Sequence, residues 1–117
     1  MTIGKIQAQL RPLQIMVSRS IIREKKDSEK TLERSLVEKI RQHGGICLKL
    51  QGNMYAGMPD RLILLPEGRV IFVELKSEGI KPRKLQLIRH EELRALGFRV
   101  FVIDTHEKLT QFLDEQV

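Results

Sequence analysis

The chain has 117 residues, of which 41% are hydrophobic and 31% charged, so it suits one domain with its own core and is too apolar for a disordered chain. Its formal net charge of +6 favours a polyanionic partner, most often nucleic acid. The single cysteine, Cys47, excludes an internal disulfide and a cysteine-rich zinc site, and one tyrosine without tryptophan argues against an aromatic platform for single strands. Without a membrane-length apolar stretch or a signal-peptide pattern, we expect an intracellular domain.

The first 27 residues differ in composition from the rest of the chain. They carry six basic residues against two acids, whereas residues 28–117 hold 15 basic and 13 acidic side chains. Apolar residues between Ile15 and Ile22 are too clustered for a freely solvated tail. We therefore divide the chain into a basic N-terminal extension, residues 1–27, which is either a flexible arm or a dimerisation element, and a domain spanning residues 28–117.

The first predicted element of this domain is a helix. Ser28 is a candidate N-cap, and Gly44-Gly45 provides the left-handed end. One face of this helix is predicted to be buried by an apolar stripe of Leu32, Leu36 and Ile40, which Val37 widens.

Four strands and two more helices follow. The strands are predicted at Ile46–Leu50, Arg61–Leu65, Val70–Lys76 and Phe98–Ile103. The tight turn Pro66–Arg69 makes the second and third strands antiparallel. A helix with Pro82 in its first turn and Gly97 after its end connects the third and fourth strands as a right-handed crossover.

The last helix is predicted to run to about Glu115, starting from a capping-box pattern formed by Asp104 and Glu107. The element order is therefore α-β-β-β-α-β-α. The sequence predicts an α/β fold, with a mixed four-stranded sheet flanked by helices.

Two acids and a lysine interrupt the apolar pattern of the second and third strands. Asp60 lies at the mouth of the second strand, and Glu74 and Lys76 are two residues apart on the third, so their side chains leave the same face. That face also carries the core-like residues Val70 and Phe72. A carboxylate and an ammonium group beside them are costly unless they are paired or bound to an ion.

Strand register decides whether Asp60 joins the other two groups. A three-residue loop, Glu67–Arg69, with Gly68 left-handed puts Asp60 opposite Lys76, and a five-residue loop puts it opposite Glu74. A four-residue loop without a bulge sends Asp60 to the other face. Two converging carboxylates suit Mg²⁺ or Mn²⁺, which can activate a water and polarise a phosphoryl oxygen, and no organic cofactor is expected.

These residues resemble the PD-(D/E)xK nuclease superfamily, and more closely its virus-type replication-repair nuclease (VRR-NUC) domain, over residues 29–103. The matching segments are Gly44-Gly45, Gly57-Met58-Pro59-Asp60-Arg61, Leu65-Pro66, Phe72-Val73-Glu74-Leu75-Lys76, Lys81-Pro82, Gln86 and Leu96-Gly97-Phe98. The resemblance implies a restriction-endonuclease-like core and a small stand-alone protein of phage or prophage type. Its place would be the cytoplasm of a bacterium or of a phage-infected host.

The resemblance also implies residue roles. Asp60 and Glu74 would be metal ligands, with the Leu75 backbone carbonyl as a third, and Lys76 the catalytic lysine. The acid of the first helix would be Glu33, with Glu29 the alternative because it lies one turn away on nearly the same face. Near the start of the crossover helix, Gln86 would position the phosphate or the attacking water.

Four basic residues follow the active strand and are candidate DNA-phosphate contacts, namely Lys81, Arg83, Lys84 and Arg89. The three histidines, His43, His90 and His106, lack metal-ligand spacing and a nucleophile partner, so we expect them to be solvated.

The leading hypothesis is a Mg²⁺- or Mn²⁺-dependent DNA endonuclease that acts on branched DNA, such as Holliday junctions, as a homodimer. An alternative is a non-catalytic, nuclease-fold module that binds DNA. A third hypothesis is an interaction protein whose N-terminal extension carries the function.

Overall fold

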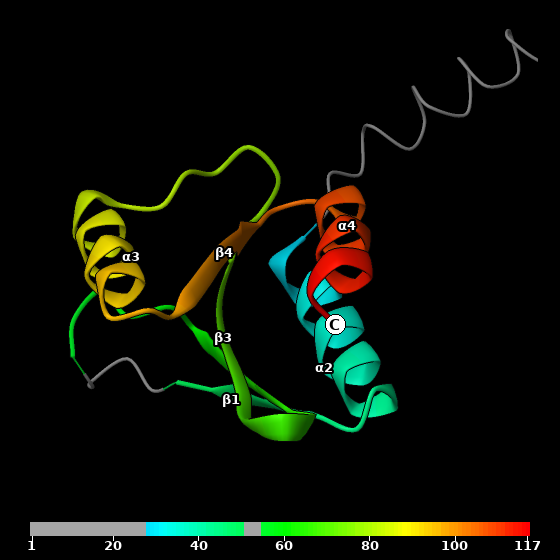
Figure 1. The fold of residues 1–117 in the computed structure, drawn as a ribbon. Coiled ribbons are helices and arrows are strands. Elements are labelled where there is room, and N and C mark those ends of the chain that lie inside the picture. The colour runs from blue at the N-terminus through cyan, green and yellow to red at the C-terminus, as the bar shows by residue number, and fades with distance from the viewer. Residues whose placement is uncertain (1–27, 51–54) are drawn as a thin grey trace, which may run out of the picture.

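The computed structural model describes residues 28–50 and 55–117 (Figure 1). The predicted N-terminal extension, residues 1–27, lies outside the described residues. Within them, three helices surround one four-stranded sheet whose strands follow the order β1-β2-β3-β4. No helix in this described part is long and apolar enough to cross a membrane.

Helix α2 (Glu29–Gln42) starts and ends as the sequence predicts. The Ser28 hydroxyl caps it by accepting a hydrogen bond from the Thr31 N–H at 3.2 Å, and Gly44 follows its end with a φ of +79°. The predicted stripe of Leu32, Leu36 and Ile40 is fully buried. Val37 is 36% exposed, so its predicted place in that stripe is wrong: it lies at the edge of the face that packs on the sheet.

The sheet is mixed, as predicted. Its strands are β1 (Ile46–Lys49), β2 (Arg61–Leu65), β3 (Arg69–Leu75) and β4 (Arg99–Ile103). The first three are antiparallel, whereas β4 runs parallel to β3 after the crossover helix α3 (Lys84–Ala95). With α4 (His106–Gln116), the described order confirms the predicted α/β class and the order α-β-β-β-α-β-α.

The turn between β2 and β3 sets the register. Leu65 pairs with Arg69, and the 3-10 turn η1 (Pro66–Gly68) lies between them. Pro66 has no N–H with which to extend the ladder, and Glu67 and Gly68 are both left-handed, with φ of 67° and 72°.

The three-residue Glu67–Arg69 loop is therefore wrong, although the left-handed Gly68 is confirmed. Arg61 pairs with Val73, which places Asp60, one residue further out, opposite Glu74. This is the register of the second predicted alternative, although the loop has three residues, Pro66–Gly68, rather than the predicted five.

Two helix starts differ from the sequence prediction. Pro82 lies outside α3, whose N-cap is Arg83. The N-cap of α4 is Thr105 rather than Asp104: the Thr105 hydroxyl accepts from the Lys108 N–H, while Asp104 accepts from the Gly79 N–H and the Lys108 ammonium. Tertiary contact with Gly79 thus draws Asp104 away from the predicted capping box.

The helices cover the two faces of the sheet unequally. Figure 1 shows α2 and α4 together on one face and α3 alone on the other. The α2/α4 face holds the larger core, which includes the odd-numbered residues Ile63, Ile71, Val73, Leu75 and Ile103. A smaller cluster, with Phe72, Leu93 and Val100, lies beneath α3. Glu74 has the parity of Phe72, so it faces α3.

Candidate active site

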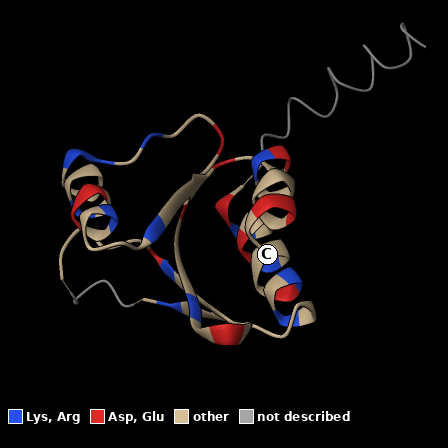
Figure 2. Ribbon diagram, in the orientation of Figure 1, with Lys and Arg blue, Asp and Glu red and all other residues tan. Residues whose placement is uncertain are grey.

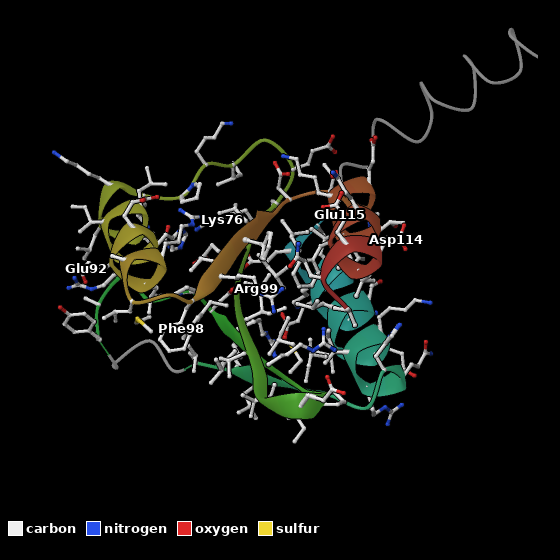
Figure 3. All side chains as sticks on the ribbon, in the orientation of Figure 1. Lys76, Glu92, Phe98, Arg99, Asp114 and Glu115 are labelled. Atoms are coloured by element: carbon white, nitrogen blue, oxygen red, sulfur yellow. The ribbon has the colours of Figure 1, made fainter. Side chains whose placement is uncertain are left out.

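Three charged side chains from two neighbouring strands meet beneath α3. Asp60 directly precedes β2, Glu74 lies at the end of β3, and Lys76 follows it. Figure 3 shows Lys76 on the side of the sheet that α3 covers. The observed register therefore brings together the two acids and the lysine that the sequence singled out.

Backbone hydrogen bonds fix the position of Asp60. Its Oδ1 accepts from the Leu75 N–H at 3.0 Å, and its carbonyl oxygen accepts from the Leu50 N–H at 2.8 Å. Asp60 is thus held between β1 and β3 at the point where both ladders end. A carboxylate fixed by main-chain donors needs no reorganisation before it binds a ligand.

Glu74 is the most deeply buried carboxylate of the site, at 3% exposure. Its Oε2 lies 3.6 Å from the Lys76 Nζ and accepts a 3.4 Å hydrogen bond from the Gln86 Nε2. Its Oε1 is buried without a hydrogen-bond partner and lies 3.8 Å from the Nε2 of His90. Buried polar atoms are nearly always satisfied, so this oxygen marks a position where a ligand would be accommodated.

The same burial makes both carboxylates hard to ionise. Burial is the main cause that raises the pKa of Asp60 to about 6, against the hydrogen bond from Leu75, and the charge of Glu29 adds to the rise. Burial and then the charge of Asp60 raise the pKa of Glu74 to about 7, although Lys76 opposes them. Two desolvated carboxylates that repel each other are what a divalent cation would stabilise.

The donor set fits a hard divalent cation. Among residues 28–50 and 55–117, no three His, Cys, Asp or Glu side chains form a ready metal cluster. Mg²⁺, however, is commonly bound through one or two carboxylates and keeps several waters. Asp60 and Glu74 meet that requirement, and the unpartnered Oε1 of Glu74 provides a free acceptor.

The carboxylates open into a pocket between the sheet, α3 and the loop that precedes β2. Asp60 and Glu74 line it from the sheet, and Arg83 and Gln86 line it from the start of α3. Tyr55, which the sequence analysis did not assign to the site, also lines this pocket. The pocket is therefore lined by two carboxyl groups, a guanidinium group and an amide.

Gln86 has two partners. Its Oε1 accepts from the Arg83 N–H at 2.7 Å, which closes the first turn of α3, and its Nε2 donates to Glu74. The amide is therefore oriented at both ends and aimed at the site.

The two candidate acids of α2 lie in different surroundings. Glu33 forms an ion pair with Arg61, whose side chain is 7% exposed. Since Arg61 has the opposite parity to Asp60, this pair lies on the α2/α4 face. Glu29 is the acid of α2 whose charge raises the pKa of both Asp60 and Glu74. The structure thus places Glu29 within electrostatic reach of the carboxylates and commits Glu33 to Arg61.

His90 does not match the solvated side chain that the sequence analysis expected. It is 1% exposed, and burial, followed by the charge of Arg94, lowers its pKa. Its position four residues after Gln86 puts both side chains on the same face of α3. Helical spacing from Gln86 was the signal that could have identified it.

The predicted DNA-contact residues divide into two groups. Lys81, Arg83 and Lys84 are exposed, and Figure 2 shows basic positions gathered where the chain enters α3. The side chain of Arg89 is 14% exposed and donates to the Ala56 carbonyl and to Glu92. Three of the four basic groups are therefore open to a polyanion.

The described residues thus form an α/β domain with one buried carboxylate, one half-buried carboxylate and a lysine at the end of a β-hairpin, and comparisons with known proteins identify the class to which it belongs. No protein-family model matches the chain. A protein of Acyrthosiphon pisum secondary endosymbiont phage 1, named "Putative nuclease p44", is 44% identical over 79 residues, which cover 68% of this chain and 85% of that protein. A solved structure described as "VRR_NUC domain" matches with a TM-score of 0.71 at 32% identity, over 76% of this chain and 97% of that one.

The chain belongs to the VRR-NUC family. The family resemblance found in the sequence is thereby confirmed, and so is the fold that it implied.

Proposed function

We propose that this protein is a metal-dependent endonuclease that hydrolyses phosphodiester bonds in DNA. The observation that carries the proposal is the grouping of Asp60, Glu74 and Lys76: the two desolvated carboxylates line one pocket, and the Lys76 ammonium lies 3.6 Å from Glu74. The similarity to a phage protein named as a nuclease supports the same activity.

In this proposal Asp60, Glu74 and the Leu75 carbonyl hold Mg²⁺ or Mn²⁺. The bound ion would supply an activated water and charge stabilisation at the phosphate. Lys76 is the catalytic lysine: its ammonium lies beside Glu74, where it can orient the attacking water or neutralise negative charge that develops on the phosphate. Gln86, held by Arg83 and Glu74, positions the phosphate or the water.

We assign the role of the first-helix acid to Glu29. The support is electrostatic: its charge acts on both carboxylates, whereas the charge of Glu33 is balanced by Arg61. Glu29 would accept a hydrogen bond from a water molecule bound to the metal.

For the substrate we propose branched DNA of the Holliday-junction type, cleaved by a homodimer. The exposed Lys81, Arg83 and Lys84 would contact phosphates beside the scissile bond, a form of recognition that does not depend on base sequence. A domain of residues 28–117 is small compared with a four-way junction, so two copies would span it more readily than one. Residues 1–27 would extend the basic footprint or join the two copies.

The experiment is cleavage of a labelled four-way junction beside matched linear duplex and single strand, with Mg²⁺, Mn²⁺ or EDTA. Paired nicks confined to the junction and lost in EDTA are the expected result. Cleavage of all three substrates would retain the nuclease and remove the preference for junctions. Binding without cleavage under either metal would overturn the activity and leave a DNA-binding module.

Light scattering during size-exclusion chromatography, with and without the junction, tests the dimer. A mass of one chain in both runs would contradict it.

A further inference from the structure

The one tyrosine of the chain stands at the rim of the candidate active site. Tyr55 is 63% exposed, and it lines the same pocket as Asp60 and Glu74. An aromatic ring that is mostly open to solvent contributes little to a core, and the described core clusters do not include it. Its position, rather than its burial, needs an explanation.

Arg89 holds this ring in place. The guanidinium carbon lies 3.6 Å from the centroid of the Tyr55 ring, a cation–π contact that covers one face. Arg89 is itself fixed, because its Nε donates to the Ala56 carbonyl at 2.7 Å and its Nη1 donates to both carboxylate oxygens of Glu92. One ring face is therefore covered by a rigid cation, and the exposed area belongs to the rest of the ring.

The backbone beside Tyr55 is adapted to this contact. Gly57 has a φ of +84°, and a Cβ at that position would lie 2.8 Å from the Leu85 carbonyl oxygen. Only glycine permits so close an approach of the loop to α3 in this conformation. The ring is thus presented by a loop that is closely docked on the helix carrying Gln86.

We propose that Tyr55, supported by Arg89, stacks a single unpaired nucleobase next to the scissile phosphate. Every nucleobase has a π face that stacks on an aromatic ring without regard to sequence, and a cation on the opposite face strengthens such stacks. A base inside a continuous duplex is already stacked on its neighbours and is not available to the ring. The subsite therefore favours DNA with an unstacked base at a junction, flap or gap, and in this respect it deepens the proposed function and rests on it.

The chain has too few aromatic residues for an extended stacking platform. One ring is not a platform along a strand. It is sufficient for one base, and its place beside Asp60 and Glu74 makes that base the neighbour of the reacting phosphate.

Intrinsic fluorescence provides a direct test, because the chain has one tyrosine and no tryptophan, so its emission reports on residue 55 alone. The full-length protein is titrated in EDTA, where no cleavage occurs, with an oligothymidylate and with an abasic strand of the same length and phosphate number. We expect the oligothymidylate to quench the emission and the abasic strand to leave it unchanged. Equal quenching, or none with either strand when both bind, would overturn the subsite.

Substitutions of Tyr55 distinguish stacking on the aromatic ring from the effect of side-chain size. Tyr55→Phe keeps the π face and should bind a labelled oligothymidylate as the wild type does, whereas Tyr55→Leu should bind it roughly five- to a hundredfold more weakly. Neither change should lessen binding to the abasic strand. Since Tyr55 is exposed, both variants are expected to fold. Equal affinity of Tyr55→Leu and the wild type for the oligothymidylate would contradict the proposal.

The outcomes distinguish the subsite from the nuclease activity. Base-dependent quenching by a protein that cleaves no substrate would retain the subsite and overturn the activity. Cleavage by a protein without base-dependent quenching would retain the activity and overturn the subsite.

Discussion

The two faces of the sheet have been filled in different ways. On the α2/α4 face, Leu32, Leu36, Ile40, Ile63 and Ile71 are fully buried. On the α3 face, the apolar residues are few, and the carboxylate of Glu74 and the ring of His90 are buried among them with polar atoms unsatisfied. The α2/α4 face stabilises the fold through apolar burial. The α3 face is less stabilising, because it buries polar groups that only a bound ligand would satisfy.

The largest effect on the α3 face is expected from Lys76. Lys76→Ala removes the ammonium beside Glu74 and should lower metal-dependent cleavage about a thousandfold or more, while the fold is retained. Cleavage kinetics with Mg²⁺ and a thermal melt measure the two quantities. Lys39→Ala, which removes an exposed lysine of α2, is the matched control. Unchanged cleavage by Lys76→Ala would refute the assigned role.

The largest effect on the α2/α4 face is expected from Leu36, which is fully buried. Leu36→Ala should lower the free energy of unfolding by about 2–5 kcal/mol through the lost apolar burial and the cavity left behind. Urea denaturation measures it. Leu87→Ala on the outer side of α3, where Leu87 is 49% exposed, should change stability by about 0.5 kcal/mol or less. Similar losses for the two variants would contradict the assignment of Leu36 to the core of the α2/α4 face.

The two acids of α2, Glu29 and Glu33, are expected to differ in the same way as the two faces: one affects the site and the other affects stability. Glu33→Gln leaves the buried Arg61 without its charged partner and should lower the free energy of unfolding by about 1–3 kcal/mol. Glu29→Gln should leave stability nearly unchanged and weaken metal affinity by roughly 10- to 100-fold. Denaturation and Mg²⁺ titration of cleavage separate the two effects. If Glu33→Gln were the variant that lost metal affinity, Glu33 would be the site acid after all.

The smallest expected effect concerns pH and Glu74 in the metal-free protein. Because folding raises the pKa of Glu74 from 4.5 to about 7, the folded state favours the protonated acid. Its contribution to stability is therefore present below about pH 4.5 and is lost as pH rises through about 7. Glu74→Gln cannot ionise, so at pH 8 it should be more stable than the wild type, by about 1–3 kcal/mol.

Thermal melts in EDTA at pH 5 and pH 8 check this difference, which should be small at the lower pH. Because Glu74 must lose its proton before it can bind a metal ion, the Mg²⁺ affinity of the wild type should rise between pH 5 and 8. A wild type more stable than Glu74→Gln at pH 8 without metal would show that the carboxylate is not desolvated as the geometry implies.

Much of the fold could be predicted because the signals were local. The four-residue spacing of Leu32, Leu36 and Ile40 identified α2, and the Ser28 cap and Gly44 identified its ends. The prediction for α3 was less complete, because this helix carries exposed apolar residues, such as Leu87 and Ile88, as well as buried ones. Periodicity alone did not show that His90 would face the sheet, and so the ring was expected in solvent.

By itself, the sequence determined the order of the elements. It also identified Asp60, Glu74 and Lys76 as candidate site residues, because a charged residue in an otherwise apolar strand is visible in the sequence alone. Only the tertiary structure decided how these residues meet. The register depends on a turn in which both Glu67 and Gly68 are left-handed. A left-handed conformation is rare for a non-glycine residue, so it could not be predicted for Glu67 from the sequence. Glu33 pairs with Arg61 of another element, and Arg89 contacts Tyr55 of another segment, and local pattern carries no information about such contacts across the fold.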